Sequence, residues 1–231
     1  NLVTGKICGA EVLSRCKHPV KGLIQPNDFI PLFERNGFIL RLDEYMWEEA
    51  CRTLARWRDE GRTPVPLSVN ISRYHIQHND LVGAWKHLIK KYNIPTSYLT
   101  LEITETFFYD SKDLYDVLEQ LQAMGFRLEV DDFGAGYSSL NMIRQIPVDT
   151  IKIDKDFLDK KLATDKGKIV ISHTIAMAKD LKLDVVAEGV ETKEHVDFLK
   201  SSSCDIAQGF FFAKPMPLEE FEKIYFENNA Q

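Results

Sequence analysis

The segment most informative about the fold is Leu128-Glu129-Val130-Asp131-Asp132-Phe133-Gly134-Ala135-Gly136-Tyr137-Ser138-Ser139-Leu140. Its mostly apolar first part ends in two adjacent carboxylates, Asp131 and Asp132, and a glycine-containing turn follows. Two neighbouring carboxylates repel each other, so an apolar strand does not end this way for stability. A divalent cation is the simplest ligand that would keep both carboxylates ionised. The alternative is a solvated Asp-Asp loop that caps a helix. Because similar endings recur along the chain, we favour the metal.

The composition limits the class of protein. The chain has 231 residues, of which 44% are hydrophobic, and a formal net charge of −6. This length suffices for one sizeable core, and the negative charge argues against a protein that binds DNA or RNA duplexes. A small anionic substrate remains compatible, because bound metal ions can reverse the local charge.

Cysteine usage and hydropathy indicate a reducing, cytoplasmic location. The cysteines have no C-x-x-C spacing, which argues against a disulfide framework or a zinc site; they are Cys8, Cys16, Cys51 and Cys204. The chain has no apolar run of about 18 residues, so we expect no membrane contact by this domain. It also has no visible signal peptide. These observations leave open whether the full-length protein has a membrane anchor upstream of Asn1.

Short apolar segments alternate with segments of helical periodicity. We predict strands at 7–13, 66–72, 99–106, 126–131, 150–154, 184–191 and 206–212. Helices are predicted at 26–37, 40–59, 81–92, 110–124, 138–146, 165–181, 193–200 and 218–226. Such alternation is typical of a parallel sheet with βαβ crossovers. At this length it indicates an α/β fold of the (β/α)8 TIM type, one strand short of eight. A doubly wound open sheet is the runner-up, although the sequence has no G-x-G-x-x-G turn or P-loop.

Polar side chains lie at or near the ends of these strands. In a barrel, the carboxyl ends of the strands meet at one mouth, so we expect Glu11, Asn70, Glu102, Asp131, Asp132, Lys152, Glu188 and Gln208 to lie together. Oxygen ligands without histidine or thiolate favour Mg²⁺ or Mn²⁺, and such a site suits hydrolysis of a phosphodiester.

Several of these residues also have an ordinary structural explanation. Glu11 could face water on an edge strand, and Asn70 could simply form a turn. Lys152 lies between Ile151 and Ile153 and needs an anionic partner if it is buried. We assign His173 to the inner stripe of its helix as a core or rim residue and not as a ligand.

Several of these segments together resemble those of a known protein family. The chain resembles the EAL domain family of cyclic di-GMP phosphodiesterases in segments that follow the family's order over almost the whole chain. The matching segments are Glu11-Val12-Leu13 with Arg15, Val69-Asn70-Ile71-Ser72, Glu102-Ile103-Thr104-Glu105, 131–140, Ile151-Lys152-Ile153-Asp154, Glu188-Gly189-Val190-Glu191, and Gln208-Gly209 through Lys214-Pro215. The resemblance implies one EAL-type barrel domain over residues 1–231, whose antiparallel first strand would be missing before Asn1. Sensory or cyclase-like domains could precede it.

The resemblance also implies a function and a site. The expected reaction is hydrolysis of cyclic di-GMP to linear pGpG with two divalent cations, Mg²⁺ or Mn²⁺. Metal ligands would be Glu11, Asn70, Glu102, Asp131 and Asp132, and catalytic residues would be Glu188 as base or ligand, Lys152, Gln208 and Glu105, which braces the 132–139 loop. Substrate contacts would come from Leu13, Arg15, Asp154 and Pro215. A homodimer is expected.

The chain departs from the family pattern at two positions near Glu11. Val12 replaces the alanine of the signature, and Cys16 stands where the family usually has tryptophan. Neither change removes a catalytic type of residue. The alternative function is a catalytically silent cyclic di-GMP receptor or partner-binding domain on the same fold. Because the ligand-type residues are all present, we favour the enzyme.

Overall fold

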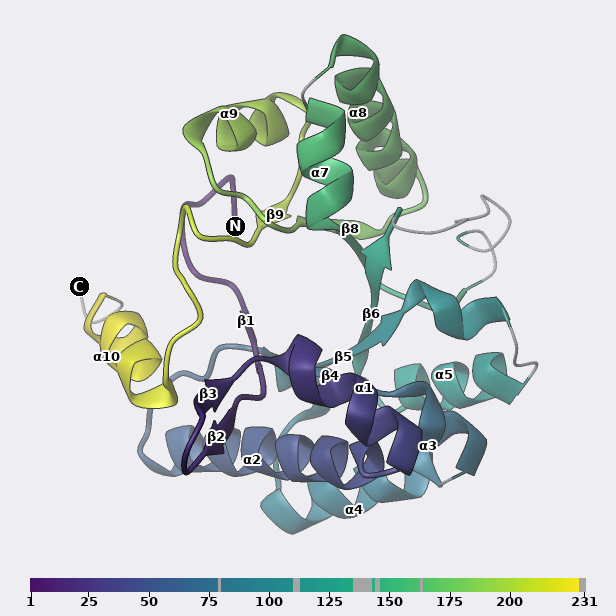
Figure 1. The fold of residues 1–231 in the computed structure, drawn as a ribbon, viewed down its shortest axis with the longest axis vertical. Coiled ribbons are helices and arrows are strands. Elements are labelled where there is room, and N and C mark those ends of the chain that lie inside the picture. The colour runs from purple at the N-terminus through teal and green to yellow at the C-terminus, as the bar shows by residue number, and fades with distance from the viewer. Residues whose placement is uncertain (79, 110–112, 135–142, 144–145, 163, 229–231) are drawn as a thin grey trace. The chain divides into compact units, whose positions relative to one another are not determined.

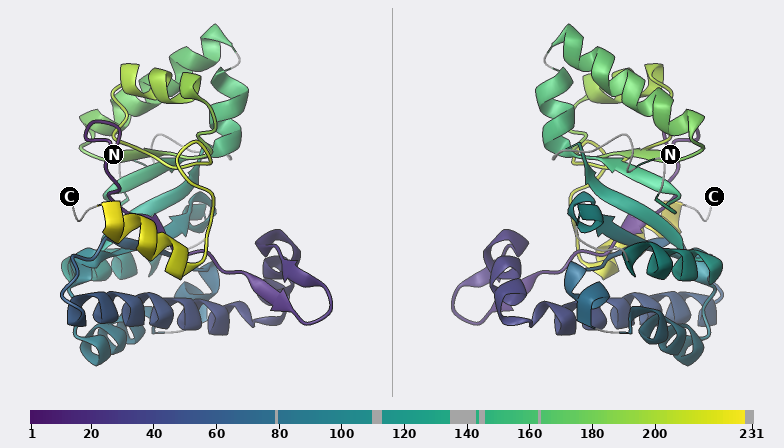
Figure 2. Two further views of the ribbon diagram at one scale, coloured as in Figure 1. Left: turned by 90° about the vertical axis from the view of Figure 1, so that its left-hand side faces the viewer. Right: turned by 90° about the vertical axis from the view of Figure 1, so that its right-hand side faces the viewer.

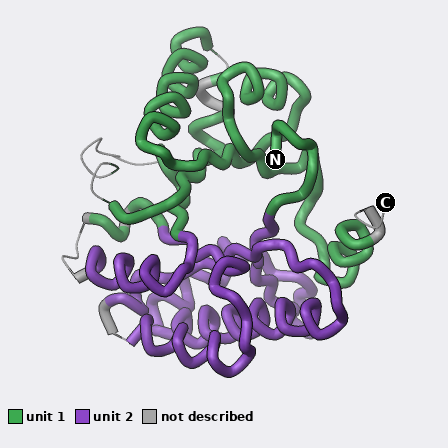
Figure 3. Tube along the Cα trace, turned by 180° about the vertical axis from the view of Figure 1, so that it is seen from behind, with its two compact units in different colours: residues 1–8, 104–109, 128–231 green, residues 9–103, 110–127 purple. Residues whose placement is uncertain are grey.

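The computed structural model describes residues 1–78, 80–109, 113–134, 143, 146–162 and 164–228. The chain divides into two compact units (Figure 3). Unit 1 consists of Asn1–Cys8, Thr104–Tyr109 and Leu128–Gln231, and unit 2 consists of Gly9–Ile103 and Asp110–Arg127. The expectation of a single domain over residues 1–231 stays a prediction.

Unit 2 contains three parallel strands and the helices that follow them in the chain (Figure 1). Strand β4 pairs with β1 on one side and with β5 on the other. The elements are β1 (Ala10–Glu11), β2 (Cys16–His18), β3 (Gly22–Ile24), α1 (Pro26–Asn36), α2 (Ile39–Asp59), β4 (Leu67–Asn70), α3 (Arg73–His78), α4 (Leu81–Tyr92), the 3₁₀ turn η1 (Thr96–Tyr98), β5 (Leu99–Thr104, its last residue in unit 1) and α5 (Asp113–Ala123).

The helices of unit 2 form where the periodicity predicts them. Helix α4 begins after Asp80, whose Oδ1 accepts a hydrogen bond from the Gly83 backbone N at 2.8 Å, as an N-capping aspartate does. Its buried face includes Trp85, which is fully buried and packs with its ring centroid 5.0 Å from that of Trp47 on α2. Aromatic packing of this kind contributes to stability beyond the buried area.

Two strands, one helix and the 3₁₀ turn η1 of unit 2 were not predicted. Strands β2 and β3 form an antiparallel hairpin, in which Gly22 has a left-handed φ of 74°. Figure 2 shows this hairpin lying together with α1. Helix α3 was not predicted either. Each of these elements spans between three and six residues, too few for a periodic hydrophobic pattern to emerge.

Unit 1 contains a parallel series of strands in the order β6, β7, β8 and β9. Helices α7 and α8 lie side by side in Figures 1 and 2. The elements are the 3₁₀ turn η2 (Glu105–Tyr109), β6 (Arg127–Phe133, its first residue in unit 2), β7 (Thr150–Ile153), α7 (Lys155–Leu162), α8 (Asp165–Asp180), β8 (Asp184–Ala187), α9 (Lys193–Ser201), β9 (Ile206–Ala207) and α10 (Leu218–Asn228). The helix predicted at 138–146 falls almost wholly outside the described residues.

Two expectations about unit 1 are wrong. The predicted strand 206–212 ends after Ala207, and the three aromatics at 210–212 are between 44% and 56% exposed. The chain turns at Gly209, so the aromatics follow the strand and do not lie within it. Helix α8 buries Ile171 and Ile175, whereas Ile169 and His173 are exposed. This helix carries two apolar stripes, and periodicity alone does not say which one faces the core.

No helix within the described ranges combines the length and apolar character that crossing a membrane requires.

Candidate active site

A β-bulge brings the adjacent carboxylates of Asp131 and Asp132 together. In the β6–β7 ladder Val130 pairs with Ile151 and Phe133 pairs with Ile153, so β6 holds one residue more than β7 between these pairs. Neighbouring side chains of a regular strand point to opposite faces. The extra residue breaks this alternation, and Asp132 has a left-handed φ of 57°. Aspartate tolerates this conformation better than most residues do.

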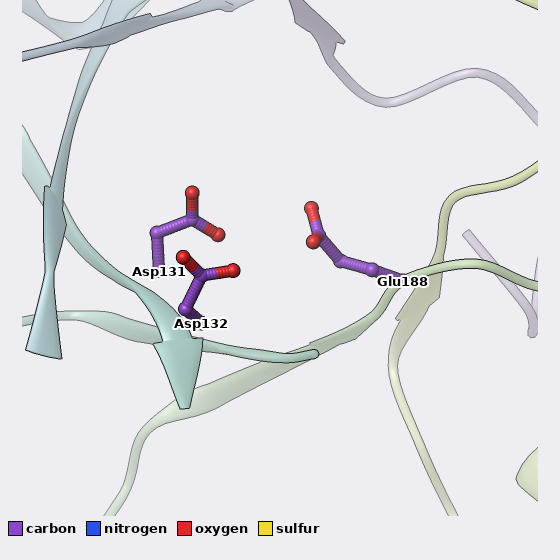
Figure 4. Close-up of side chains that lie close together, drawn as sticks. All are labelled: Asp131, Asp132 and Glu188. Carbon is purple, nitrogen blue, oxygen red and sulfur yellow. The ribbon is translucent and has the colours of Figure 1, made fainter. Parts of the chain in front are cut away.

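The two carboxylates of the bulge converge with Glu188, which follows β8 directly (Figure 4). One oxygen from each of Asp131, Asp132 and Glu188 lies within 4.8 Å of the others. Because β7 lies between β6 and β8 in this part of the sheet, its side chains can reach both. The expectation that these carboxylates come together is therefore met within unit 1.

Lys152 on β7 neutralises part of this charge. Its Nζ lies 3.1 Å from Asp131 Oδ1 and 2.8 Å from Glu188 Oε1, and its side chain is only 2% exposed. A buried ammonium group requires anionic partners, which the sequence context of Lys152 predicts. The two carboxylates are 15% and 18% exposed, so the ion pairs are largely shielded from water.

The donor set fits a divalent cation. Three carboxylates and one ammonium leave a formal charge of −2 in this cluster. Asp131 Oδ1 is buried and makes no directed hydrogen bond with any described residue, although Lys152 Nζ is near it. A buried acceptor of this kind is costly unless a further partner satisfies it. Oxygen donors without thiolate or imidazole favour Mg²⁺ or Mn²⁺.

The backbone on both sides of Glu188 is fixed by hydrogen bonds. Glu188 N donates to Ile153 O at 3.0 Å, Gln208 N donates to Ala187 O at 2.8 Å, and Val190 N donates to Gln208 O at 3.0 Å. These bonds place Gln208 beside the end of β8, directly after β9 and not inside it. A Cβ on the next residue, Gly209, would lie 2.3 Å from Val190 backbone atoms.

The other expected site residues of unit 1 have structural contacts of their own. Glu105 is 3% exposed, and its Oε2 accepts a hydrogen bond from Gly134 N at 3.3 Å. It thus holds the backbone just beyond the bulge. Asp154 Oδ1 accepts from Phe157 N at 3.1 Å and caps α7, a helix that was not predicted. Pro215 is exposed in the segment before α10.

Unit 2 carries a second set of candidate oxygen ligands at or near the carboxyl ends of its strands. Glu11 ends β1, Asn70 ends β4, and Asn70 pairs in register with Glu102 on β5. Asn70 Nδ2 lies 3.4 Å from Glu11 Oε1, and Glu102 is 1% exposed. The structure thus places these three residues on neighbouring strands of the unit.

The two expected substrate residues of unit 2 follow β1. Leu13 is 39% exposed, and Arg15 is half-buried, with its Nη1 donating to Ser14 O at 2.8 Å.

Sequence reasoning missed a buried polar pair behind Asn70. Asp43 on α2 is 7% exposed, and its Oδ2 lies 3.5 Å from Nε2 of the fully buried His75 on α3. Burial raises the pKa of Asp43 to about 7 and lowers the pKa of His75 to about 4, because it disfavours both charged forms. A signal existed in the sequence: Asp43, Trp47 and Ala50 share one helical stripe with i, i+4 and i+7 spacing.

Comparison with known proteins identifies the family. A model of the EAL domain matches residues 1–215. MucR of Pseudomonas aeruginosa, a bifunctional diguanylate cyclase/cyclic di-GMP phosphodiesterase, is 37% identical over 217 residues, which are 94% of this chain and 32% of MucR. The cyclic di-GMP phosphodiesterase NbdA of the same species is 36% identical over 228 residues, which are 97% of this chain and 29% of NbdA. The chain therefore spans about a third of the length of these relatives.

A solved structure confirms the fold. The PaMucR phosphodiesterase in complex with c-di-GMP matches with a TM-score of 0.88 at 37% identity, over 94% of this chain and 88% of that chain. The predicted TIM-like α/β fold of EAL type is therefore confirmed. From the family match over residues 1–215 and this structural likeness, we conclude that the chain belongs to the EAL domain family.

Proposed function

We propose that this chain is a metal-dependent phosphodiesterase that hydrolyses cyclic di-GMP to linear pGpG. The observation that carries the proposal is the cluster of Asp131, Asp132 and Glu188, with one oxygen of each within 4.8 Å, around the buried Lys152. The related proteins MucR and NbdA, at 37% and 36% identity, are named as cyclic di-GMP phosphodiesterases.

Two divalent cations, Mg²⁺ or Mn²⁺, are the proposed cofactors. Bound divalent cations acidify a coordinated water and offset negative charge on the phosphodiester. We assign Glu11, Asn70, Glu102 and Asp131 to the first cation, and Asp131 and Asp132 to the second. The oxygen-only chemistry of both ligand sets supports this assignment.

The chain's own groups act on the water and the phosphate. Glu188 accepts the proton of the attacking water, or binds the second cation. Lys152 carries its positive charge between Asp131 and Glu188, where it orients both carboxylates and stabilises negative charge that develops on the phosphate. Gln208 orients the water through its amide group. Glu105 braces the loop at 132–139, of which residues 135–139 lie outside the described residues. The hydrogen bond from Gly134 N to Glu105 Oε2 supports this role.

Four residues are proposed to recognise the substrate. Arg15 binds a phosphate of the substrate, because a guanidinium matches phosphate geometry. Leu13, Asp154 and Pro215 contact the nucleotide. We also propose a homodimer, which sedimentation of the purified chain would measure; a monomer at every concentration would contradict it.

The decisive experiment measures product from cyclic di-GMP by chromatography with Mg²⁺ and then with Mn²⁺. We expect pGpG that EDTA abolishes. Glu188→Gln and Asp131→Asn should abolish product while circular dichroism shows a folded chain. Glu194→Gln, an exposed carboxylate on α9, is the control and should leave the rate unchanged. Tight binding of cyclic di-GMP without product would instead establish a receptor.

A further inference from the structure

A buried polar cluster lies behind the turn that follows β4, on the side of α2. Asp43 is 7% exposed, and Trp47 and His75 are fully buried. Burying a carboxylate, an indole N–H and an imidazole in one core is costly unless each group makes a specific interaction. The contacts of this cluster therefore call for an explanation beyond core packing.

Each of the three residues 70–72 has a backbone group held by a hydrogen bond. Trp47 Nε1 donates to the carbonyl oxygen of Asn70 at 2.9 Å. Ile71 N donates to Glu102 O at 2.9 Å. Ser72 N donates to Asp43 Oδ2 at 2.9 Å. The turn is thereby fixed from the neighbouring strand and from two side chains on successive turns of α2.

His75 supports both side chains from α3. Its Nε2 lies 3.5 Å from Asp43 Oδ2, and its ring centroid lies 4.4 Å from that of Trp47. The imidazole thus limits the rotation of the carboxylate and of the indole. A backbone turn held in this way has little freedom to move the side chain that it carries, and that side chain is the exposed amide of Asn70.

We propose that Asp43 and Trp47 are positioning residues that fix the Asn70 turn and thereby set the affinity of the chain for a divalent cation. This inference rests on the proposed function, which assigns Asn70 as a metal ligand. Groups that orient a metal ligand through a second contact commonly change metal affinity by about 10-fold to 100-fold when they are removed. Neither residue touches the substrate or the reacting atoms in this scheme.

The chain provides a matched pair of variants. Trp47→Phe removes the indole donor to Asn70 O. Trp85→Phe removes the same group from an equally buried tryptophan whose Nε1 has no hydrogen-bond acceptor among the residues that the structure describes. The two variants lose similar volume in the same aromatic cluster. Only the first should loosen the Asn70 turn.

The experiment titrates metal-free protein with Mn²⁺ and measures free Mn²⁺ by electron paramagnetic resonance. We expect Trp47→Phe to raise the dissociation constant about 10-fold and Trp85→Phe to leave it within about twofold. Hydrolysis by Trp47→Phe should recover when the Mn²⁺ concentration is raised. Asn70→Ala should also weaken binding, and the double variant Trp47→Phe/Asn70→Ala should bind no more weakly than Asn70→Ala alone, because the indole acts through Asn70.

A second series on Asp43 keeps the proposal testable if Trp47→Phe folds poorly. Asp43→Asn retains an oxygen that can accept from Ser72 N, whereas Asp43→Ala does not. We expect Asn to preserve Mn²⁺ affinity and Ala to reduce it. Equal affinity in Trp47→Phe and Trp85→Phe, with Asp43→Ala also unchanged, would overturn the inference. Wild-type protein that binds Mn²⁺ but yields no pGpG would overturn the proposed activity alone, because affinity is measured without turnover.

Discussion

Asp43→Asn should make the stability of unit 2 depend on pH in a range where the wild-type pair contributes no dependence. Burial raises the pKa of Asp43 from 3.8 to about 7 and lowers the pKa of His75 from 6.5 to about 4. Near pH 5 the folded pair therefore carries one proton, on Asp43. The unfolded pair also carries one, on His75. Stability changes with pH only where the two states bind different numbers of protons.

The substitution removes this balance. With asparagine at position 43, the folded chain holds neutral His75 and binds no proton at this pair, while the unfolded chain still protonates the imidazole. His75 has a depressed folded pKa, so its contribution is complete above pH 6.5 and is lost as pH falls towards 4. At 1.36 kcal/mol per pH unit, the loss approaches about 3 kcal/mol across this range. His75 is fully buried, so solvent does not screen the effect.

The opposite substitution should reverse the sign. His75→Gln leaves Asp43 alone with a folded pKa raised to about 7. A raised pKa gives stability that is complete below pH 3.8 and is lost as pH rises through 7, by up to about 4 kcal/mol. Glu34 and Glu44 add a smaller part of the elevation. Both variants are less stable than wild type to begin with. We therefore predict how the free energy of unfolding changes with pH, and not its absolute value.

Tryptophan fluorescence during urea unfolding provides the assay. The chain has three tryptophans, Trp47, Trp57 and Trp85, and all lie in unit 2. Unfolding curves at pH 4.5, 5.5 and 6.5 give the difference in stability between each variant and wild type, in which other titrating groups cancel. Asp59→Asn, an exposed aspartate at the end of α2, is the control. If Asp43→Asn follows the wild-type curve at all three pH values, the assignment of protons is refuted.

Three further substitutions test the site and its supports. Lys152→Met should destabilise metal-free protein by about 3–5 kcal/mol, since it removes the buried ammonium group that Asp131 and Glu188 face. Added Mn²⁺ should recover part of this loss, and metal-free protein as stable as wild type would contradict the ion pairs. Gly209→Ala places a Cβ 2.3 Å from the Val190 backbone and should lower thermal stability clearly, whereas Gly9→Ala, whose Cβ lies 3.7 Å from its nearest neighbour, should not. Asp132→Gly should be at least as stable as wild type and Asp132→Val less stable by about 1–2 kcal/mol, because only the second opposes a left-handed φ; equal unfolding midpoints would argue against the bulge.

The sequence predicted the alternation of strands and helices well where the segments were long. Helix α4 has the predicted bounds, 81–92, and α2 differs from its prediction by one residue. The missed strands are too short for a hydrophobic period to identify them. The hairpin strands β2 and β3 have three residues each. The aromatic run at 210–212 has a strand-like composition, but the chain has already turned at Gly209.

The sequence indicated which polar side chains lie close together better than it indicated how they meet. Adjacent carboxylates at a strand end indicated a metal site, and a lysine between two isoleucines indicated a buried ion pair. The sequence could not predict how Asp131 and Asp132 reach the same side of the strand, because in regular alternation one of them would face away. The extra residue of β6 and the left-handed φ of Asp132 break the alternation, so that both carboxylates reach the same site. Neither Asp131 nor Asp132 is a glycine, the residue that marks one class of bulge in a sequence.

The buried pair of Asp43 and His75 was missed for a different reason. Polar residues in an amphipathic helix are assigned to the solvent face by default, and here the default fails. The pair also leaves no trace in the pH dependence of wild-type stability. Folded and unfolded states bind the same number of protons over about pH 4–6.5, so a titration of wild-type stability would show no sign of two strongly shifted groups. Such a pair can hold a backbone turn without making the fold sensitive to pH. We therefore expect its presence to be revealed only when one partner is replaced.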